Sequence, residues 1–280
     1  MIYLVLAILS SALISIGMRF GEKYVKNEMG MFMANYAVCL LLSLLYLDGN
    51  GGSSMVGELM PTTVFLGGIC GILYLVNFIL LKYNMKKNGV VLSSTFMKLG
   101  VLIPTLMAII VFKEIPTGIQ VIGIVLALIA IVMIHFEKEA VGEGKQKLGL
   151  LVLLILSGTT DSMANIFDQI GTADAQDGYL LVTFFVALVL ALLFMLFGKE
   201  KVSKKDLLFG ILIGIPNYFS ARFLLLSLGE VSAVLVYPVY SVATIIVIAL
   251  AGVIFFKEKI SRKKAVALGL ILLALGLINS

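Results

Sequence analysis

Long runs without a charged side chain dominate this sequence. Residues 116–134 and 231–256 contain no Asp, Glu, Lys or Arg. A helix needs about 20 consecutive, mostly apolar residues to cross the hydrocarbon core of a bilayer, and both runs are of about that length. Because a chain in lipid must satisfy its backbone N–H and C=O groups internally, such runs form helices. The sequence therefore predicts an all-α membrane protein.

The composition agrees with a lipid environment. Only 13% of the residues are charged, against about 25% in soluble globular proteins, and the mean hydropathy is +1.12. Residues 1–18 are apolar, with no basic region before them and no cleavage site followed by a polar chain. This segment is therefore expected to be a retained spanning helix and not a signal peptide. The net charge of +5 does not indicate nucleic-acid binding, because the basic residues lie at the ends of the apolar runs.

The apolar runs divide the chain into ten predicted spans with short polar connections. The longest polar connections are residues 48–58, 137–147 and 168–177, and none is long enough to fold as a separate domain. The predicted spans are residues 2–20, 30–47, 61–82, 88–112, 116–136, 147–168, 178–198, 206–228, 230–256 and 262–280.

Parts of the first five spans recur in the last five. The sequence Phe-Lys-Glu occurs at residues 112–114 and again 144 residues later. Residues 67–71 match 210–214, each with two glycines four positions apart, a spacing that lets helices pack closely in lipid. Residues 8–11 likewise match 155–158. The repeating unit is therefore five spans long.

We predict two five-helix repeats, residues 1–140 and 145–280. Because five is odd, the second repeat enters the membrane in the opposite sense, an inverted-topology architecture common in secondary transporters. The loops after spans one, three, five, seven and nine carry 18 Lys and Arg residues, and the opposite loops carry only Lys113. Since positively charged loops stay in the cytoplasm, both termini of this multi-pass cell-membrane protein are predicted to face outward.

Two stretches resemble the EamA-type branch of the drug/metabolite transporter superfamily. These are residues 112–123 and 256–261, and Gln120 and Gly123 occupy positions where that family commonly shows them. Ten spans in two halves match the family over essentially the whole chain, although its members are generally described with both termini inside. The resemblance implies a ten-helix carrier with a central cavity between its halves, which moves a small organic metabolite.

Three ionisable residues lie inside the predicted spans: Lys98, Asp161 and Arg222. Each costs about 2.5–3.5 kcal/mol or more at the bilayer centre, so each is expected to face a cavity or a partner. Asp161 and Arg222 share a depth and could form a structural ion pair or line the substrate path, or Arg222 could extend to the interface. Lys98 lies near the midplane, where it could bind substrate or bond to carbonyl and hydroxyl groups of its own helix.

Polar and aromatic residues accompany these charges. Pro104, Pro216 and Pro238 lie within predicted spans, which membranes tolerate where other groups satisfy the freed carbonyl. Nearby side chains could line a cavity for an apolar or aromatic body with a charged end. They are Tyr74, Asn77, Phe96, Tyr218, Tyr237 and Tyr240. Tyrosines satisfied in a dry core are the alternative.

The remaining motifs indicate structure more than chemistry. Glu114 and Glu258 are expected to be helix-terminus features, near the positive N-terminal end of the next helix. Cys39 and Cys70 lie inside apolar runs and are expected to be packing residues. The single histidine, His135, lies at a helix end, and no metal-ligand spacing or nucleophile–base set is present. No enzyme activity, cofactor or metal site is predicted.

The sequence thus favours a secondary-active or facilitative transporter of a small organic metabolite, an amino acid or related zwitterion or carboxylate, working by alternating access. Lys98 or Arg222 would hold the carboxylate, and Asp161 would hold an amine or carry a proton as the coupling ion. A multidrug or cation exporter using Asp161 is the first alternative. A non-transporting scaffold or receptor is the second, and the repeat argues against it. The expected partners are the bilayer and the small-molecule substrate, not nucleic acid. Monomer and homodimer stay open.

Overall fold

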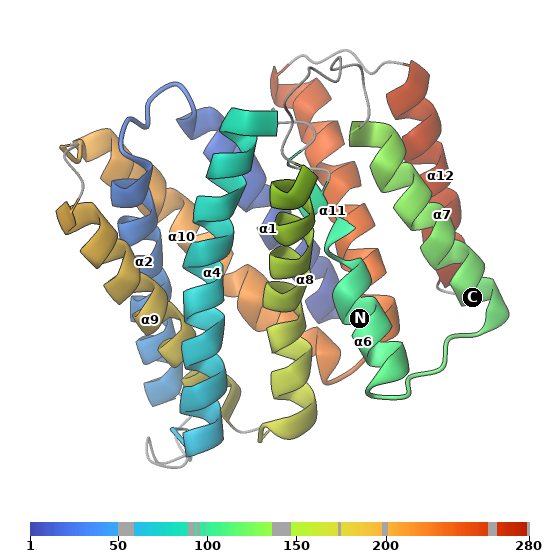
Figure 1. Cartoon of the computed structure of the whole chain (residues 1–280), viewed down its shortest axis with the longest axis horizontal. Helices are drawn as coiled ribbons and strands as arrows, with labels where there is room; N and C mark the ends of the chain where they lie inside the picture. Colours follow the sequence, from blue (N-terminus) through green and yellow to red (C-terminus); the bar gives the residue numbers. More distant parts are fainter. Residues whose placement is uncertain are drawn as a thin grey trace. The chain divides into compact units, whose positions relative to one another are not determined.

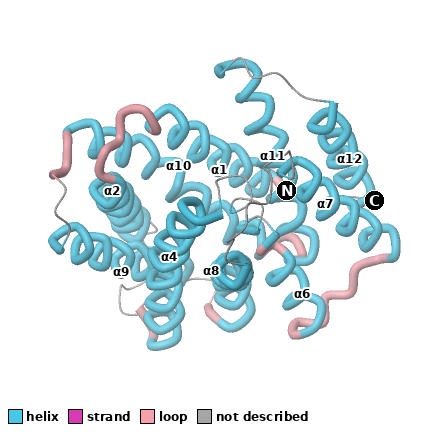
Figure 2. Tube along the Cα trace, turned by 45° about the horizontal axis from the view of Figure 1, so that its top comes forward, coloured by secondary structure: helices cyan, strands magenta, loops and turns pink. Residues whose placement is uncertain are grey.

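The computed structural model describes most of the chain, and its regular structure there is helical. The described residues are 1–49, 59–88, 93, 96–97, 99–135, 147–172, 175–197, 201–256 and 262–278. Within these ranges there is no strand (Figure 2), which confirms the all-α prediction. Seven of the described helices are long and apolar enough to cross a membrane, and the helical segments Gly118–Met133 and Ala265–Ile278 are shorter and also apolar.

The described part of the chain contains ten helices, one for each predicted span. Eight of them match their predicted spans to within three residues at both ends. The helices are α1 (Ile2–Gly21), α2 (Glu28–Gly49), α4 (Pro61–Asn88), α6 (Leu102–Ile110), α7 (Gly118–His135), α8 (Lys147–Ile170), α9 (Gln176–Phe197), α10 (Lys204–Leu228), α11 (Ala233–Phe256) and α12 (Arg262–Ile278).

The third and fourth predicted spans have the wrong boundaries. Helix α4 continues to Asn88, six residues beyond the predicted end, because the lysines in this polar stretch are good helix formers. Asn84 turns inward there, and its Nδ2 donates to the carbonyl of Leu80 at 2.9 Å. Helix α6 begins only at Leu102, which places Pro104 in the first turn, where a missing N–H costs little, and not inside a long helix.

One compact unit comprises residues 1–75 and 166–229, and so combines helices from both sequence halves. Helix α10 packs on α1 and α2, and α2 also packs on α9 (Figure 1). Glycines permit the close approach of α10 to α2. A Cβ atom added at Gly210 would lie 2.3 Å from the carbonyl oxygen of Met31, and one at Gly214 would lie 2.8 Å from that of Asn35. The predicted packing role of this glycine pair is confirmed.

The matching glycines of the first half permit a close approach of α4 to α9 in the same unit. A Cβ atom at Gly71 would lie 2.5 Å from the carbonyl oxygen of Thr183 in α9, and one at Gly67 would lie 3.0 Å from that of Tyr179. Cys70 lies between these two glycines in the sequence and is buried, and it forms no disulfide. Cys39 is also buried without a disulfide, and its thiol donates to the carbonyl of Gly214 at 3.3 Å, so both cysteines lie in packed surroundings, as predicted.

The second compact unit comprises residues 76–165 and 230–280. Within it α7 and α12 lie side by side, and α11 packs on α6, α7 and α12 (Figure 1). Gly123 permits the contact between α7 and α12, because a Cβ atom there would lie 2.8 Å from the side chain of Ile278. Each unit combines both sequence halves. The two repeats and their inverted orientation stay predictions.

Glu114 corrects one prediction about the Phe-Lys-Glu turn. Its carboxylate does not serve the next helix but the start of α11, where Oε2 accepts hydrogen bonds from Ser232 Oγ at 2.5 Å and Val234 N at 2.9 Å. Lys113, just before it, has a φ of 58°, a left-handed conformation that costs a non-glycine residue about 1 kcal/mol or more. Glu258 lies outside the described residues.

Helix α7 instead begins with its own cap. The side chain of Gln120 accepts from the N–H of Thr117 at 2.9 Å, and Thr117 Oγ1 accepts from the N–H of Gln120 at 3.3 Å. This reciprocal pair is a capping box, and it explains structurally the glutamine noted in the sequence.

Candidate functional site

The predicted site residues fall into two groups. Tyr74, Tyr218 and Arg222 belong to the first unit, and Asn77, Phe96, Asp161, Tyr237 and Tyr240 belong to the second. Lys98 lies outside the described residues.

Arg222 is the centre of the first group. Its Nη1 bonds to the carboxylate of Asp177, and its Nη2 donates to Oδ2 of the same carboxylate at 3.4 Å. Nη1 also donates to the hydroxyl of Tyr218 at 3.0 Å. The guanidinium carbon lies 4.2 Å from the ring centroid of Tyr46, a cation–π contact. The side chains of Arg222 and Asp177 are only 15% and 8% exposed, so the charge is held by three kinds of contact at once.

Aromatic rings that stack on or tilt against one another pack next to this arginine. Tyr46 and Tyr218 stack with centroids 5.7 Å apart. Phe184 of α9 contacts Tyr218 at 6.2 Å and Tyr74 of α4 at 6.3 Å, both between centroids. Phe184 therefore joins two tyrosines that the sequence placed in one site. Tyr218 is fully buried, and Tyr74 is half-buried.

Asp177 is a functional candidate that the sequence analysis missed. It looked like the last residue of a polar connection, but α9 begins at Gln176 and places Asp177 in its buried first turn. Arg222 thus has an acidic partner in its own unit. Of the three ionisable residues predicted inside spans, two are basic and one is acidic, and Asp177 adds a second acid to this set. The predicted pairing of Arg222 with Asp161, which belongs to the other unit, stays a prediction.

In the second group, Asp161 contacts Tyr237. It lies on α8, nine residues before Ile170, which is about 14 Å along the helix axis at 1.5 Å per residue. Its side chain is exposed. Its backbone carbonyl accepts a hydrogen bond from the hydroxyl of Tyr237 on α11 at 2.8 Å. Tyr237 is therefore a buried, satisfied tyrosine, and its contact fixes the turn of α8 that carries Asp161.

The chain before α6 contacts α8 one turn earlier. Ser157 Oγ donates to the carbonyl of Met97 at 3.1 Å. A Cβ atom at Gly158 would lie 2.3 Å from the carbonyl oxygen of Gly100, so the two backbones touch there. Met97 follows the half-buried Phe96 in the chain. Helix α8 is thus held by the segment around Met97 one turn before Asp161 and by α11 at Asp161 itself.

Two amides of the second unit carry buried polar atoms without a hydrogen-bond partner. They are Oδ1 of Asn77, on α4, and both Oδ1 and Nδ2 of Asn165, on α8. Asn165 is 0% exposed and was not singled out in the sequence. The feature of the sequence that could have identified Asn165 is its position one helical turn after Asp161. An unsatisfied buried polar group costs about 1–3 kcal/mol, so these amides require an explanation.

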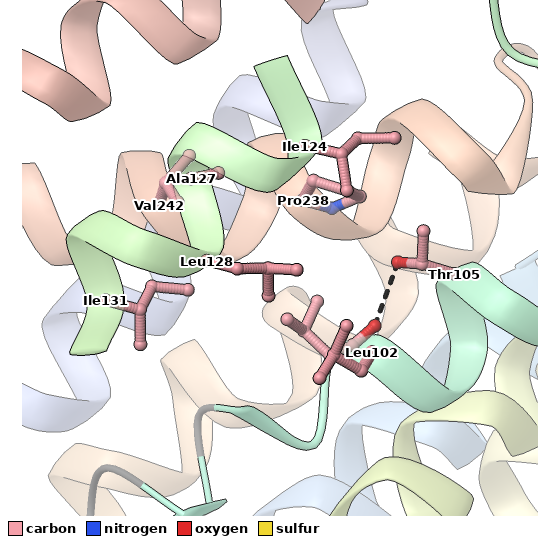
Figure 3. Close-up of a pocket in the computed structure, with 9 residues that line it drawn as sticks. Leu102, Thr105, Ile124, Ala127, Leu128, Ile131, Pro238 and Val242 are labelled. Carbon is pink, nitrogen blue, oxygen red and sulfur yellow. Dashed lines mark hydrogen bonds between the residues drawn. The ribbon is translucent and has the colours of Figure 1, made fainter. Parts of the chain in front are cut away.

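A small pocket lies elsewhere in this unit, between α6, α7 and α11 (Figure 3). Pro238 and Val242 line it from α11, and Ile124 and Leu128 line it from α7. Thr105 contributes its polar side chain, but the hydroxyl already donates to the carbonyl of Val101 at 2.8 Å. The pocket offers an apolar surface without an ionisable group. Across the described ranges, no group of three or more His, Cys, Asp or Glu side chains is arranged to hold a metal ion.

Comparison with known proteins agrees with this architecture. The model of the EamA-like transporter family matches residues 1–136 and again residues 148–280. An uncharacterized protein of Haemophilus influenzae (strain ATCC 51907 / DSM 11121 / KW20 / Rd) is 24% identical over 272 residues, covering 92% of this chain and 91% of the relative.

A solved crystal structure of a protein superposes with a TM-score of 0.79 at 15% identity, covering 99% of this chain and 94% of that chain. At this identity the likeness shows the fold alone. The family matches span nearly the whole sequence and include the predicted site residues. This chain is therefore a multi-pass membrane protein that belongs to the EamA-like transporter family of the drug/metabolite transporter superfamily.

Proposed function

We propose that this protein is a secondary carrier of the cell membrane that moves an amino acid, or a related zwitterion or carboxylate, by alternating access. Asp161 carries the proposal. An exposed carboxylate about 14 Å inside a spanning helix is costly in lipid, which favours a position facing a hydrated path or a substrate cation. In a family of transporters, that cost is explained if Asp161 binds a solute amine or carries a proton.

The contacts around Asp161 support a defined position for its side chain. Tyr237 holds its carbonyl from α11, and Ser157 holds the preceding turn against Met97. Lys98, a basic residue within the fourth predicted span, is the candidate group for a substrate carboxylate. Arg222 is less suited to that role, because Asp177 already balances its charge.

The alternative from the same class is a cation exporter that uses Asp161 alone. The Arg222–Asp177 pair favours this alternative over a purely anionic substrate, because Asp177 neutralises one of the two basic residues that were predicted inside spans. The alternative from another class is a scaffold or receptor without transport. Such a protein has no need of an ionisable group in mid-helix.

Uptake into proteoliposomes separates these functions. Vesicles containing the purified protein are incubated with a pool of the twenty proteinogenic L-amino acids, and their contents are read by mass spectrometry. The same vesicles are tested for ethidium movement as a cation probe. An amino-acid carrier loses uptake in both Asp161→Asn and Lys98→Gln, whereas a cation exporter loses ethidium movement only in Asp161→Asn. Absence of both activities in the wild-type protein would favour the scaffold.

Proton coupling has a separate test. If Asp161 carries the coupling proton, an imposed pH gradient should drive solute accumulation, and a protonophore should abolish it. Asp161→Asn should then retain only passive exchange, since an amide cannot release a proton. Accumulation that is unaffected by the protonophore would contradict proton coupling and leave the carrier proposal intact.

A further inference from the structure

Among the described asparagines, four are buried as whole residues, and of these only Asn165 has an amide in which neither atom has a hydrogen-bond partner, whereas the half-buried Asn77 lacks a partner for its oxygen alone. Asn27 accepts from the N–H of Gly30 at 2.9 Å, Asn35 accepts from Asn217 at 3.2 Å, and Asn84 donates to Leu80. Asn165 has no hydrogen-bond partner for either amide atom. Native folds leave few buried polar groups unpaired. In this chain, an amide with two unpaired atoms at 0% exposure is therefore informative.

The position of this amide connects it to Asp161. Both residues lie on α8, four positions apart, so their Cβ atoms lie on one face of the helix, about 5–6 Å apart. Asp161 is exposed and Asn165 is closed off. One small molecule can reach two side chains at that spacing. A carboxylate and an amide together offer acceptors for an ammonium group and two donors for a carboxylate or hydroxyl group.

We propose that Asn165 is a binding group for the transported solute and forms, with Asp161, a subsite for a small zwitterion with adjacent ammonium and carboxylate groups. The proposal rests on the transport function proposed above and assigns a residue to it. The carboxylate of Asp161 accepts from the ammonium group, and Nδ2 of Asn165 donates to the solute carboxylate. In the conformation described here the amide is closed off, and the conformational change of transport exposes it.

A buried water molecule that satisfies the amide is the competing explanation. The two explanations differ in what an apolar replacement does to stability. Leucine has the same number of side-chain heavy atoms as asparagine, branches at the same carbon and needs no hydrogen-bond partner. If Asn165 is unsatisfied in the resting protein, Asn165→Leu leaves the melting temperature of the purified, solute-free protein unchanged or raises it. If a structural water is bound, the replacement lowers it.

Asn35→Leu is the matched control for stability. Asn35 is also buried, but its loss removes the acceptor of Asn217, so its melting temperature should fall by at least about 3 °C. A fall of the same size in Asn165→Leu would overturn the proposal.

Accessibility is tested by thiol labelling, which needs no knowledge of the substrate. Asn165→Cys is made in a Cys39→Ala, Cys70→Ala background, reconstituted, and treated with the methanethiosulfonate reagent that carries an ethyltrimethylammonium group. We expect labelling at least ten times faster than at Ser43→Cys, a control on α2 that is equally buried. Labelling no faster than in this control would overturn the proposal.

Transport gives the third measurement. For whichever amino acid the wild-type protein takes up, Asn165→Leu should raise KM at least ten-fold while the protein stays folded. An unchanged KM would overturn the assignment of Asn165. If the wild-type protein transports no amino acid, the proposed function fails, and the labelling and stability results still decide whether position 165 belongs to a hydrated binding path.

Discussion

Glu114 binds the backbone N–H of Val234, 120 positions away in the sequence, at 2.9 Å. The carboxylate also accepts from the hydroxyl of Ser232. It thus caps the N-terminal end of α11, where the helix dipole is positive and the first N–H groups lack partners. The residue that identifies the Phe-Lys-Glu turn in the sequence therefore ties the α6–α7 connection to α11.

We predict that removing this cap destabilises the protein. Glu114→Ala should cost about 1 kcal/mol, as loss of a helix cap does, and Glu114→Gln should cost less because the amide oxygen still accepts. Thermal unfolding of the purified protein in detergent measures both. Glu22→Ala, at an exposed acidic residue just after α1, is the control and should change little. Equal melting temperatures for Glu114→Ala and Glu22→Ala would contradict the capping role.

The pair of Arg222 and Asp177 gives a second prediction. Asp177→Asn should be strongly destabilising, by roughly 3–5 kcal/mol, because it leaves a buried guanidinium without its counter-charge. Adding Arg222→Gln should recover much of this loss. If the counter-charge of Arg222 were instead Asp161, as the shared depth in the sequence allowed, Asp161→Asn would be the destabilising change. Comparing Asp177→Asn with Asp161→Asn by thermal unfolding and by solute flux tests the assignment.

The expected outcome is an unstable Asp177→Asn and a folded, inactive Asp161→Asn. If only the Asp161 variant loses stability, the structural partner of Arg222 is Asp161. If neither does, the arginine is satisfied by Tyr218 and Tyr46 without a counter-charge.

Glycine substitutions in α4 give a third prediction with an internal control. A Cβ atom at Gly71 would lie 2.5 Å from the backbone of α9, whereas one at Gly68 would meet nothing within 4 Å. Gly71→Ala should therefore destabilise the protein, since backbones must move apart. Gly68→Ala should be neutral or stabilise it by about 0.5–1 kcal/mol, because alanine has the higher helix propensity. Two variants with similar melting temperatures would show that α4 and α9 do not pack as described.

The orientation of the chain is the fourth prediction. Eighteen Lys and Arg residues in one set of predicted loops, against one in the other, predict that both termini lie outside the cytoplasm. Reporters that are active on only one side of the membrane, such as alkaline phosphatase and green fluorescent protein, are fused to the C-terminus. Phosphatase activity without fluorescence is expected. Fluorescence alone would show that the charge distribution does not govern the topology of this chain.

Hydropathy was sufficient to predict the bounds of most helices, because the length and apolar content of a segment decide whether it crosses a bilayer. It failed at α4, where Lys86 and Lys87 extend the helix beyond the apolar run. It also failed at Asp177, which reads as a loop residue but enters the first turn of α9. The cap from Glu114 to α11 depends on a contact between distant segments, which periodicity does not report. The packing role of the glycine pairs could be predicted because the same spacing recurs in both halves of the sequence.

The sequence could predict which residues belong to the candidate site better than it could predict which of them contact one another. Charges within apolar runs identified Asp161 and Arg222 because insertion into lipid is costly for each. The partner of Arg222 was not identified, since Asp177 contacts it only through the packing of α9 on its neighbours. Asn165 carries no charge, and its lack of partners is visible only in three dimensions.

The interleaving of the two halves constrains how the protein can be made. Helix α2 contacts α9 and α10, and α4 meets α9 through Gly67 and Gly71, so helices that leave the ribosome early have partners that are synthesised much later. Until α9 and α10 have been inserted, the faces of α2 and α4 that pack on them lack their native partners. Assembly of the first unit is therefore a late event in biosynthesis. A ribosome that stalls in the connection after α7 would release helices that cannot complete a native core.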